Sequence, residues 1–372
     1  VRGLDTVFFF YDADAMRTDL GDFPDYLYDS NPFNDVEYLL NKEILFHSVY
    51  PMIEESKAEG FTPGITTFTD YNRWQDLHTY GKNTVCPDGV GKIVPAAPEN
   101  EPLSENTKKI IYDNITQNVT SLADSYPDVE FYYFFTPYSI VWWAGDVASG
   151  SISDWLNAEQ YIIELILEHD NIKLFSFNNR ADIVADLNNY QDNMHYAEWV
   201  NSLILKWMHD GQYQLTKDNY LNYLEEECKF YTNFDYDSLN TQVDYESDYF
   251  AAALLNEELN GAAPVALTEY KAKSENGAVK FSIDEIGSHR YLCFYGVGNA
   301  ADISPTVSVY DAQDELVSQL TVEAEKLDGS KHQFVLNLPK LTGAVTIVFT
   351  GGSVENAESA DGSYAFSDIM LY

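Results

Sequence analysis

Hydrophobic residues follow two different patterns along the first two thirds of the chain. Short apolar runs at 7–12 (VFFFYD), 129–135 (VEFYYFF) and 171–177 (NIKLFSF) predict strands that are covered on both faces. Elsewhere, apolar residues recur three and four positions apart, as they do on one face of a helix. The predicted helices include residues 105–126, ended by Pro127, and residues 158–170 and 196–211. Because helices alternate with strands, the pattern predicts an α/β domain with a mostly parallel sheet.

The pattern changes near residue 262. Beyond GAAPVA at 261–266, short alternating runs of hydrophobic and polar residues are separated by Gly, Asn, Asp and Pro turns. Regular spacing of such strands is typical of a β-sandwich. We therefore expect an α/β domain at 1–262 and an all-β sandwich domain at 263–372, a division that suits a chain of 372 residues.

Composition narrows the possible partners. The 60 acidic and 21 basic residues give a formal net charge of -39, which argues against nucleic acid and anionic membranes as partners. Cys86, Cys228 and Cys293 are widely spaced, so neither a disulfide framework nor a zinc site is predicted. No apolar run reaches the roughly 20 residues that cross a bilayer, so no transmembrane segment is predicted. No cofactor is indicated.

Polar side chains follow each of the three predicted strands. Asp12 and Asp14 follow the first strand, residues 136–143 the second and residues 177–195 the third. Ligands of open α/β sheets bind at the carboxyl ends of strands, so we expect these segments to form one site, with Asp12 lining it. The alternative is that Asp12, Asp14 and Arg17 form a local turn with a surface ion pair. Two aspartates without a third ligand do not predict a metal site.

Asp192 and His195 are three residues apart and lie just before a predicted helix. In a tight turn the carboxylate would orient the imidazole, which could then take a proton from a serine and return it to a leaving group. The alternative is that Asp192 caps the helix through the amides of Met194 or His195, and that His195 has no chemical role. Spacing by itself leaves both interpretations open.

The segment FSFNNRADIVADLNNYQDNMHYAEWVN at 175–201 resembles the last conserved block of the SGNH (GDSL-like) hydrolases and their cell-surface acyltransferase relatives. Those proteins end their catalytic domain with D-x-x-H just before a final helix, a motif that Asp192 and His195 match. FYYFFTPYSIVWW at 131–143 and the stretch at 11–35 are also similar to segments of a bacterial branch of that superfamily. The resemblance implies an SGNH-like three-layer α/β sandwich, with His195 as general base and acid and Asp192 orienting it.

The chain departs from this family at the nucleophile. The family's serine lies in a G-x-S block after the first strand, and no such block precedes Val7. Ser139 lies between Tyr138 and two tryptophans and looks like part of a pocket wall, and Ser176 lies inside a predicted strand end. The resemblance therefore implies that a segment upstream of this chain supplies the nucleophile.

Two groups of aromatic residues could stack on a sugar or an acyl acceptor. Tyr138, Trp142 and Trp143 follow the second predicted strand, where they could instead form core. The second domain resembles, in strand pattern and in its closing YAFSDIMLY, the jelly-roll sandwiches that accompany carbohydrate-active enzymes. Its candidate stacking residues, for which a structural role is equally open, are Tyr291, Tyr295, Tyr310 and Tyr364.

Two functional hypotheses follow. The first is a bacterial, extracellular or cell-surface SGNH-like serine esterase or O-acyltransferase, which would act on an acylated glycan through a Ser-His-Asp acyl-enzyme. The second is a noncatalytic glycan-binding or surface-adhesion protein on a hydrolase-like scaffold. Both imply a carbohydrate partner, and they differ in whether Asp192 and His195 do chemistry.

Overall fold

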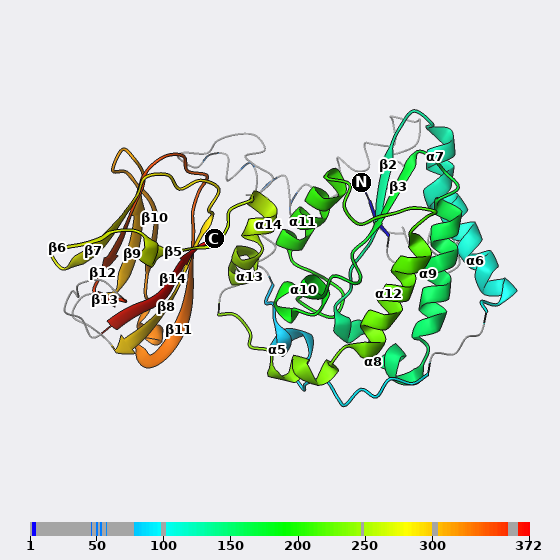
Figure 1. The fold of residues 1–372 in the computed structure, drawn as a ribbon, viewed down its shortest axis with the longest axis horizontal. Helices are drawn as coiled ribbons and strands as arrows, with labels where there is room; N and C mark the ends of the chain where they lie inside the picture. The colour runs from blue at the N-terminus through cyan, green and yellow to red at the C-terminus, as the bar shows by residue number, and fades with distance from the viewer. Residues whose placement is uncertain are drawn as a thin grey trace.

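The computed structural model describes residues 2–4, 46, 50, 53, 57, 78–97, 102–246, 249–299, 304–355 and 364–372. They form two units, which lie side by side in Figure 1. The amino-terminal unit is a small sheet surrounded by helices, and the carboxyl-terminal unit consists of two mainly antiparallel sheets. Between the units lie the short helices α13 (Tyr249–Leu254) and α14 (Asn256–Asn260).

The sheet of the amino-terminal unit has four strands in the order β1-β2-β3-β4. These are β1 (Arg2–Leu4), β2 (Phe131–Phe135), β3 (Ile172–Ser176) and β4 (Gln214–Leu215). β1, β2 and β3 pair in parallel, and β4 pairs antiparallel with β3. The register aligns Leu4 with Phe135 and Phe135 with Ser176, so the three parallel strands end at the same edge.

Helices cover both faces of this sheet. Successive side chains of a strand point to opposite faces, so neighbouring residues of β2 pack against different helices. Phe135 of β2 packs in one cluster with isoleucines of α6 (Glu105–Ile115) and α9 (Ile152–Ile166). Phe134 packs in another cluster with apolar residues of α11 (Glu198–His209). The small sheet is therefore buried on both sides, as the short apolar runs predict.

The helical segment before β2 is interrupted. Ser104 caps α6 by accepting a hydrogen bond from the amide of Thr107 at 3.0 Å. A π-helical turn at Thr116–Thr120 then leads into α7 (Ser121–Ser125). The further helices described in this unit are α5 (Lys82–Val85), α8 (Ile140–Ser149), α10 (Ala181–Val184) and α12 (Tyr220–Asn233), with 3-10 turns at Leu187–Asn189 and Tyr236–Thr241.

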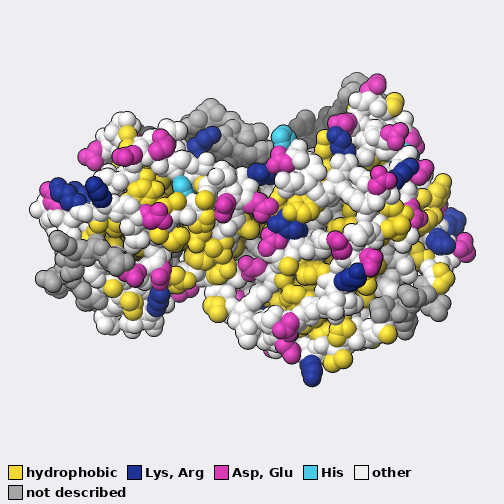
Figure 2. Space-filling model, viewed as in Figure 1, with side chains coloured by type: hydrophobic (Ala, Val, Ile, Leu, Met, Phe, Trp, Pro, Cys, Tyr) yellow, Lys and Arg dark blue, Asp and Glu magenta, His cyan; other side chains and the backbone are white. Residues whose placement is uncertain are grey.

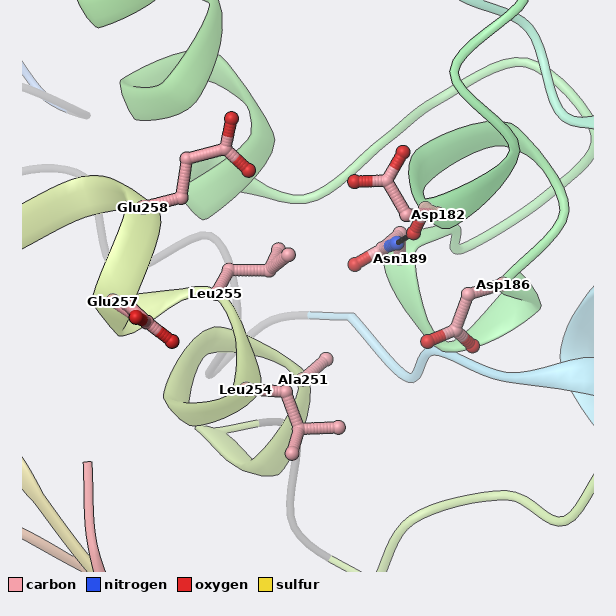
Figure 3. A pocket seen from close by; sticks show the side chains of 8 residues that line it. All are labelled: Asp182, Asp186, Asn189, Ala251, Leu254, Leu255, Glu257 and Glu258. Carbon is pink, nitrogen blue, oxygen red and sulfur yellow. Dashed lines mark hydrogen bonds between the residues drawn. The ribbon is translucent and has the colours of Figure 1, made fainter. Parts of the chain in front are cut away.

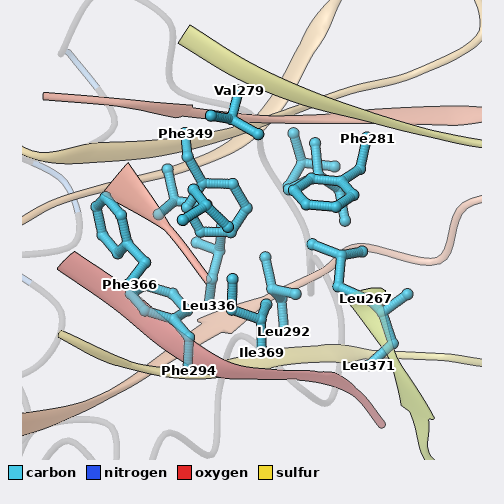
Figure 4. Packing of buried hydrophobic residues seen from close by; sticks show 14 of the residues in the cluster. Leu267, Val279, Phe281, Leu292, Phe294, Leu336, Phe349, Phe366, Ile369 and Leu371 are labelled. Atoms are coloured by element: carbon cyan, nitrogen blue, oxygen red, sulfur yellow. The ribbon is translucent and has the colours of Figure 1, made fainter. Parts of the chain in front are cut away.

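The carboxyl-terminal unit is the expected β-sandwich. One sheet has the strand order β10-β9-β12-β7-β6 and the other the order β11-β8-β14-β13, with β5 pairing on β14. Apolar side chains from both sheets meet in one core, in which Phe281, Phe294, Phe349 and Phe366 are buried (Figure 4). The strands are β5 (Val265–Ala266), β6 (Ala272–Glu275), β7 (Ala278–Ile283), β8 (Tyr291–Asn299), β9 (Thr306–Tyr310), β10 (Leu316–Thr321), β11 (Asp328–Asn337), β12 (Val345–Thr350), β13 (Ser353–Val354) and β14 (Tyr364–Leu371).

The expected fold class, an SGNH-like α/β sandwich with a mostly parallel sheet, is wrong for this chain. Of the strands that the structure describes, most belong to the two larger sheets, in which every pair except β13 with β14 is antiparallel. The parallel part is limited to β1, β2 and β3, which have 3, 5 and 5 residues. Its strand order does not reverse, so the described sheet lacks the switch point at which doubly wound sheets bind ligands. The prediction failed because the amino-terminal unit has long amphipathic helices and short strands, and the helices dominated its sequence pattern.

Candidate functional site

Residues 190–196 form a narrow loop in the amino-terminal unit. The loop follows β3 through α10 and the turn at Leu187–Asn189, and it leads into α11. An isolated β-bridge joins Tyr190 to Tyr196, and the amide of Gln191 donates to the carbonyl of His195 at 3.0 Å. These bonds close the loop and hold Asp192 and His195 within one turn.

The Asp192 carboxylate uses both of its oxygens inside this loop. Oδ1 accepts hydrogen bonds from the amides of Met194 at 2.8 Å and His195 at 2.7 Å, and Oδ2 lies 2.8 Å from Nδ1 of His195. Burial opposes ionisation of Asp192, but the hydrogen bonds from the two amides and the imidazole lower its pKa overall. The turn precedes α11, which begins at Glu198. The carboxylate therefore closes a turn, although not the first turn of the helix, and also contacts the imidazole.

The 190–196 loop is tied to the segment that follows β2. The carbonyl of Asn193 accepts two hydrogen bonds from Ser139, one from its amide at 3.1 Å and one from its hydroxyl at 3.0 Å. The hydroxyl of Tyr190 donates to the carbonyl of Pro137 at 2.8 Å. The amide of Gly81 donates to the carbonyl of Tyr190 at 3.1 Å. The segments after β2 and β3 are thus in direct contact.

The imidazole of His195 is accessible to other molecules. Its side chain is 65% exposed, and that of Asp192 is 47% exposed. No described residue is hydrogen-bonded to Nε2 of His195, whereas Nδ1 faces Asp192. An imidazole held in this way through Nδ1 can accept or donate a proton at Nε2.

Neither serine considered in the sequence is available as a nucleophile. Ser139 and Ser176 are both fully buried. The hydroxyl of Ser139 donates to the Asn193 carbonyl, and the hydroxyl of Ser176 accepts a hydrogen bond from the hydroxyl of Tyr223 at 2.7 Å. Both hydroxyls therefore have structural partners and no path to a substrate.

Asp12, expected to line the site, lies outside the described residues, as do Asp14, Arg17 and the strand predicted at 7–12. The described strand β1 lies before the predicted range in the sequence. Its last residue, Leu4, accepts a hydrogen bond from the amide of Thr136 at 3.0 Å. β1 therefore ends beside the segment that carries Pro137 and Ser139.

Tyr138 and Trp143 belong to the core. They are 3% and 4% exposed, and their ring centroids lie 6.0 Å apart. Trp143 also packs against Tyr231, at a centroid distance of 5.2 Å. The expectation that Tyr138 and Trp143 offer open faces to a sugar is wrong, because neighbouring aromatic rings occupy those faces. Trp142 is half-buried, and its ring lies 5.1 Å from that of Tyr138.

Two buried glutamates were missed by the sequence reasoning. Glu159 of α9 is 3% exposed and Glu227 of α12 is 0% exposed. A signal for the first was present, because Glu159 is three residues before Ile162 and seven before Ile166, on the buried face of α9. A carboxylate inside an apolar helical stripe is the pattern that could have identified it.

The β-sandwich carries a hollow of about 240 Å³ beside β10 and β11. Its wall combines polar and apolar side chains, namely Glu246, Leu320, Thr321, Glu323, Lys326, Gln333, Phe334 and Val335. Glu246 reaches the hollow from the segment between α12 and α13, where its carboxylate accepts a hydrogen bond from Nζ of Lys326 at 2.8 Å. The same Nζ lies 5.3 Å from the ring centroid of Phe334. Both units therefore contribute to this hollow.

The tyrosines singled out in the sandwich are not open stacking platforms. Tyr364 is 1% exposed and forms part of the core, which favours the structural alternative for this residue. Tyr295 is half-buried, and Nζ of Lys331 lies 4.2 Å from its ring centroid. Tyr291 and Tyr310 are also half-buried.

A larger cleft of about 570 Å³ lies between α10 and the two short helices α13 and α14. Asp182 and Asp186 face Glu257, Glu258 and Leu255 across it (Figure 3). Burial raises the pKa of Asp186, since its hydrogen bonds to Asn188 only partly offset that effect. The acidic walls would repel an anionic ligand.

The surface charge reflects the excess of acidic over basic residues in the sequence. Acidic side chains are spread over both units on the face drawn in Figure 2. Among the described residues, no group of three or more His, Cys, Asp and Glu is arranged to hold a metal ion. Within the same part of the chain, no helix has the length and apolar character needed to cross a bilayer.

Comparison with known proteins gives only weak likenesses. No protein-family model and no curated protein matches the sequence. A family 32 glycoside hydrolase from Bifidobacterium adolescentis is 19% identical, with a TM-score of 0.17, over 19% of this chain and 10% of that chain. A family 43 arabinoxylan arabinofuranohydrolase from Bacillus subtilis is 15% identical, with a TM-score of 0.18, over 27% of this chain and 20% of that chain.

The module CsCBM6-3 from Clostridium stercorarium, in complex with cellobiose, is 10% identical, with a TM-score of 0.20, over 29% of this chain and 91% of that chain. The chain thus spans only 10% and 20% of the length of the two hydrolases. TM-scores of 0.17 to 0.20 establish neither a shared fold nor a shared function with any of the three.

Proposed function

We propose that this chain binds carbohydrate through the hollow of its β-sandwich, in a bacterial extracellular or cell-surface setting. The observation that carries this proposal is the composition of the hollow. Hydroxyl groups of a sugar both donate and accept hydrogen bonds, while its C–H groups form apolar patches. A sugar site therefore needs donors, acceptors and an apolar wall in one concave place.

The hollow offers all three kinds of group. Lys326 is a donor, Glu246 and Glu323 are acceptors, and Gln333 can act as either. The apolar part of the wall includes Leu320 and Phe334. The overall charge of -39 favours a neutral or basic glycan over a polyanionic one.

The test is binding of neutral oligosaccharides to the wild-type chain and to Lys326→Met, measured by isothermal titration calorimetry. We expect the substitution to raise the Kd at least about tenfold, because it removes a donor from the wall. Lys273→Met is the matched control, since Lys273 is an exposed lysine of β6, paired with Glu275 and outside the hollow. Equal affinity of the two variants, or no binding of any oligosaccharide by the wild type, would overturn the proposal.

A second candidate function rests on a separate observation, the 2.8 Å contact between Asp192 and Nδ1 of an accessible His195. This arrangement supports an esterase or O-acyltransferase acting on an ester carried by a glycan. His195 would take a proton from the attacking hydroxyl and return it to the leaving alcohol, and Asp192 would hold the imidazole and stabilise its charged form. The nucleophile in this proposal is a serine other than Ser139 and Ser176. Hydrolysis of p-nitrophenyl acetate by the wild-type chain and by His195→Ala tests this candidate function.

A further inference from the structure

Glu159 and Glu227 place two carboxyl groups in the interior between α9 and α12. They are 3% and 0% exposed. The charge of Glu227 increases the cost of ionising Glu159, as a like charge in a medium of low polarity does. No described lysine or arginine contributes to the pKa shift of either group. Two unpaired negative charges at this depth would be strongly destabilising.

The polar groups around the two carboxyls are unequal. Oε1 of Glu227 accepts a hydrogen bond from the hydroxyl of Tyr231 at 2.8 Å, and the side chains of Asn178 and Tyr223 also favour its ionised form. Glu159 has no such donor, and its Oε1 is buried without a hydrogen-bond partner among the described residues. The negative charge is therefore better accommodated on Glu227, and the proton on Glu159.

The pKa shifts agree with this assignment. Burial, and then the charge of Glu227, raise the pKa of Glu159 well above its usual range. Burial raises the pKa of Glu227 to about 7, although the hydrogen bond from Tyr231 works in the opposite direction. Glu227 consequently ionises first, and Glu159 keeps its proton to higher pH.

We propose that Glu159 is held as a neutral carboxylic acid beside an ionised Glu227, and that this single buried proton keeps α9 and α12 packed together. Buried acceptors that lack a donor support this assignment. In the described part of the chain, three such oxygen atoms have no hydrogen-bond partner: Glu159 Oε1, Glu227 Oε2 and Asn178 Oδ1. A carboxylic acid supplies the missing donor. The carboxylic acid supplies this donor without a bound metal ion, so the interior does not need the space that a metal ion and its ligands require.

The other groups that face the pair do not titrate near neutral pH. Burial is the main cause that raises the pKa of the Tyr223 and Tyr231 hydroxyls and of the Cys228 thiol, all on α12. The end of β3 contributes the uncharged Ser176 and Asn178, and α8 contributes Trp143 against Tyr231. The two carboxyls therefore dominate the pH response of this cluster.

The direction of that response follows from the shifts. Both carboxyls have a higher pKa in the folded chain than in the unfolded chain, so their contribution to stability is complete below the ordinary carboxyl pKa of 4.5. It is lost as pH rises through their folded pKa values, first that of Glu227 and then that of Glu159. Loss of the last proton leaves two adjacent charges and weakens the packing of α9 on α12.

The experiment compares the wild-type chain with Glu159→Gln, Glu227→Gln and the control Glu226→Gln, which removes an exposed carboxyl of the same helix. The unfolding temperature is measured from pH 5 to pH 9 in EDTA, and again in CaCl2. We expect Glu159→Gln to flatten the decline at alkaline pH, because glutamine imitates the neutral acid. Glu227→Gln should remove the loss of stability near pH 7, because it removes the carboxyl that ionises there. Glu226→Gln should follow the wild type.

Infrared spectroscopy gives a second readout that does not depend on the stability of the variants. The wild-type chain at about pH 8.5, above the pKa of about 7 for Glu227, should show the C=O stretch of a buried carboxylic acid, and Glu159→Gln should lack that band. An unchanged band in Glu159→Gln, or a pH dependence of unfolding as steep as that of the wild type, would overturn the proposal. So would a rise of the wild-type unfolding temperature in CaCl2 that Glu159→Gln abolishes, because the pair would then hold a cation and not a proton.

Discussion

The carbonyl oxygen of Asn193 accepts two hydrogen bonds from Ser139, a residue 54 positions earlier in the chain. One comes from the amide at 3.1 Å and the other from the hydroxyl at 3.0 Å. Ser139 is fully buried, and Asn193 lies between Asp192 and His195 in the 190–196 loop. The position of the Asp192/His195 pair therefore depends on a contact with the segment after β2.

Ser139→Ala should destabilise the chain by about 0.5–1.5 kcal/mol, because it removes one buried hydrogen bond. The hydrogen bond from the backbone amide of residue 139 to the carbonyl of Asn193 stays in place. Urea unfolding followed by circular dichroism measures this change. The control is Ser149→Ala, in the exposed last turn of α8, for which we expect a change within about 0.5 kcal/mol. Equal effects of the two substitutions would show that the contact of Ser139 with Asn193 adds little to stability.

His195→Ala should lower kcat/KM for p-nitrophenyl acetate by about 10²-fold or more if the second candidate function is correct, because it removes the general base. Asp192→Asn should also lower it, since the amide no longer stabilises the imidazolium. The control is His209→Ala, because His209 is 86% exposed and lies 3.0 Å from the carboxylate of Asp210 in a similar contact. Activity that falls equally in His195→Ala and His209→Ala, or in neither, would argue against a catalytic role for the 190–196 loop.

The pKa of His332 should lie above its ordinary value and should fall when Glu246 is replaced. Nδ1 of His332 is 3.0 Å from Glu246, and Nε2 is 3.0 Å from Asp328. The bond to Glu246, and then the bond to Asp328, raise this pKa in the folded chain. Protonated His332 therefore contributes stability that is complete below pH 6.5 and is lost as pH rises through the folded pKa.

An NMR titration of the histidine ring protons measures the pKa of His332 directly. We expect Glu246→Gln to move it downward, and Glu323→Gln to leave it unchanged, because Glu323 lines the same hollow without bonding His332. The same pKa in the wild type and in Glu246→Gln would show that Glu246 does not pair with the imidazole in solution.

Gly296→Ala should destabilise the β-sandwich by about 1–3 kcal/mol through overpacking. A methyl group at this position of β8 would lie 2.1 Å from the hydroxyl oxygen of Tyr364 and 2.6 Å from two of its ring carbons. Tyr364 is 1% exposed, so its ring has little room to move. Thermal unfolding of Gly91→Ala is the control, because nothing lies within 4 Å of a methyl group there. A Gly296→Ala chain as stable as that control would mean that the ring can shift.

Much of the local structure can be predicted from the sequence. β2 at Phe131–Phe135 and β3 at Ile172–Ser176 fall inside the apolar runs at 129–135 and 171–177, and α11 at Glu198–His209 falls inside the periodic stretch at 196–211. These features depend on residues within a few positions of one another. For the same reason, the contact of Asp192 with His195 could be anticipated from a spacing of three residues.

What the sequence by itself determined is therefore the type and place of individual elements, the presence of a β-sandwich in the last third of the chain, and the proximity of Asp192 and His195. Only the tertiary structure decided that most of the described strands are antiparallel, that Tyr138 and Trp143 are core residues, and that Glu159 and Glu227 are both buried. The physical reason is separation along the chain. Periodicity shows which side of an element is apolar, but burial and pairing depend on which distant element packs against that side.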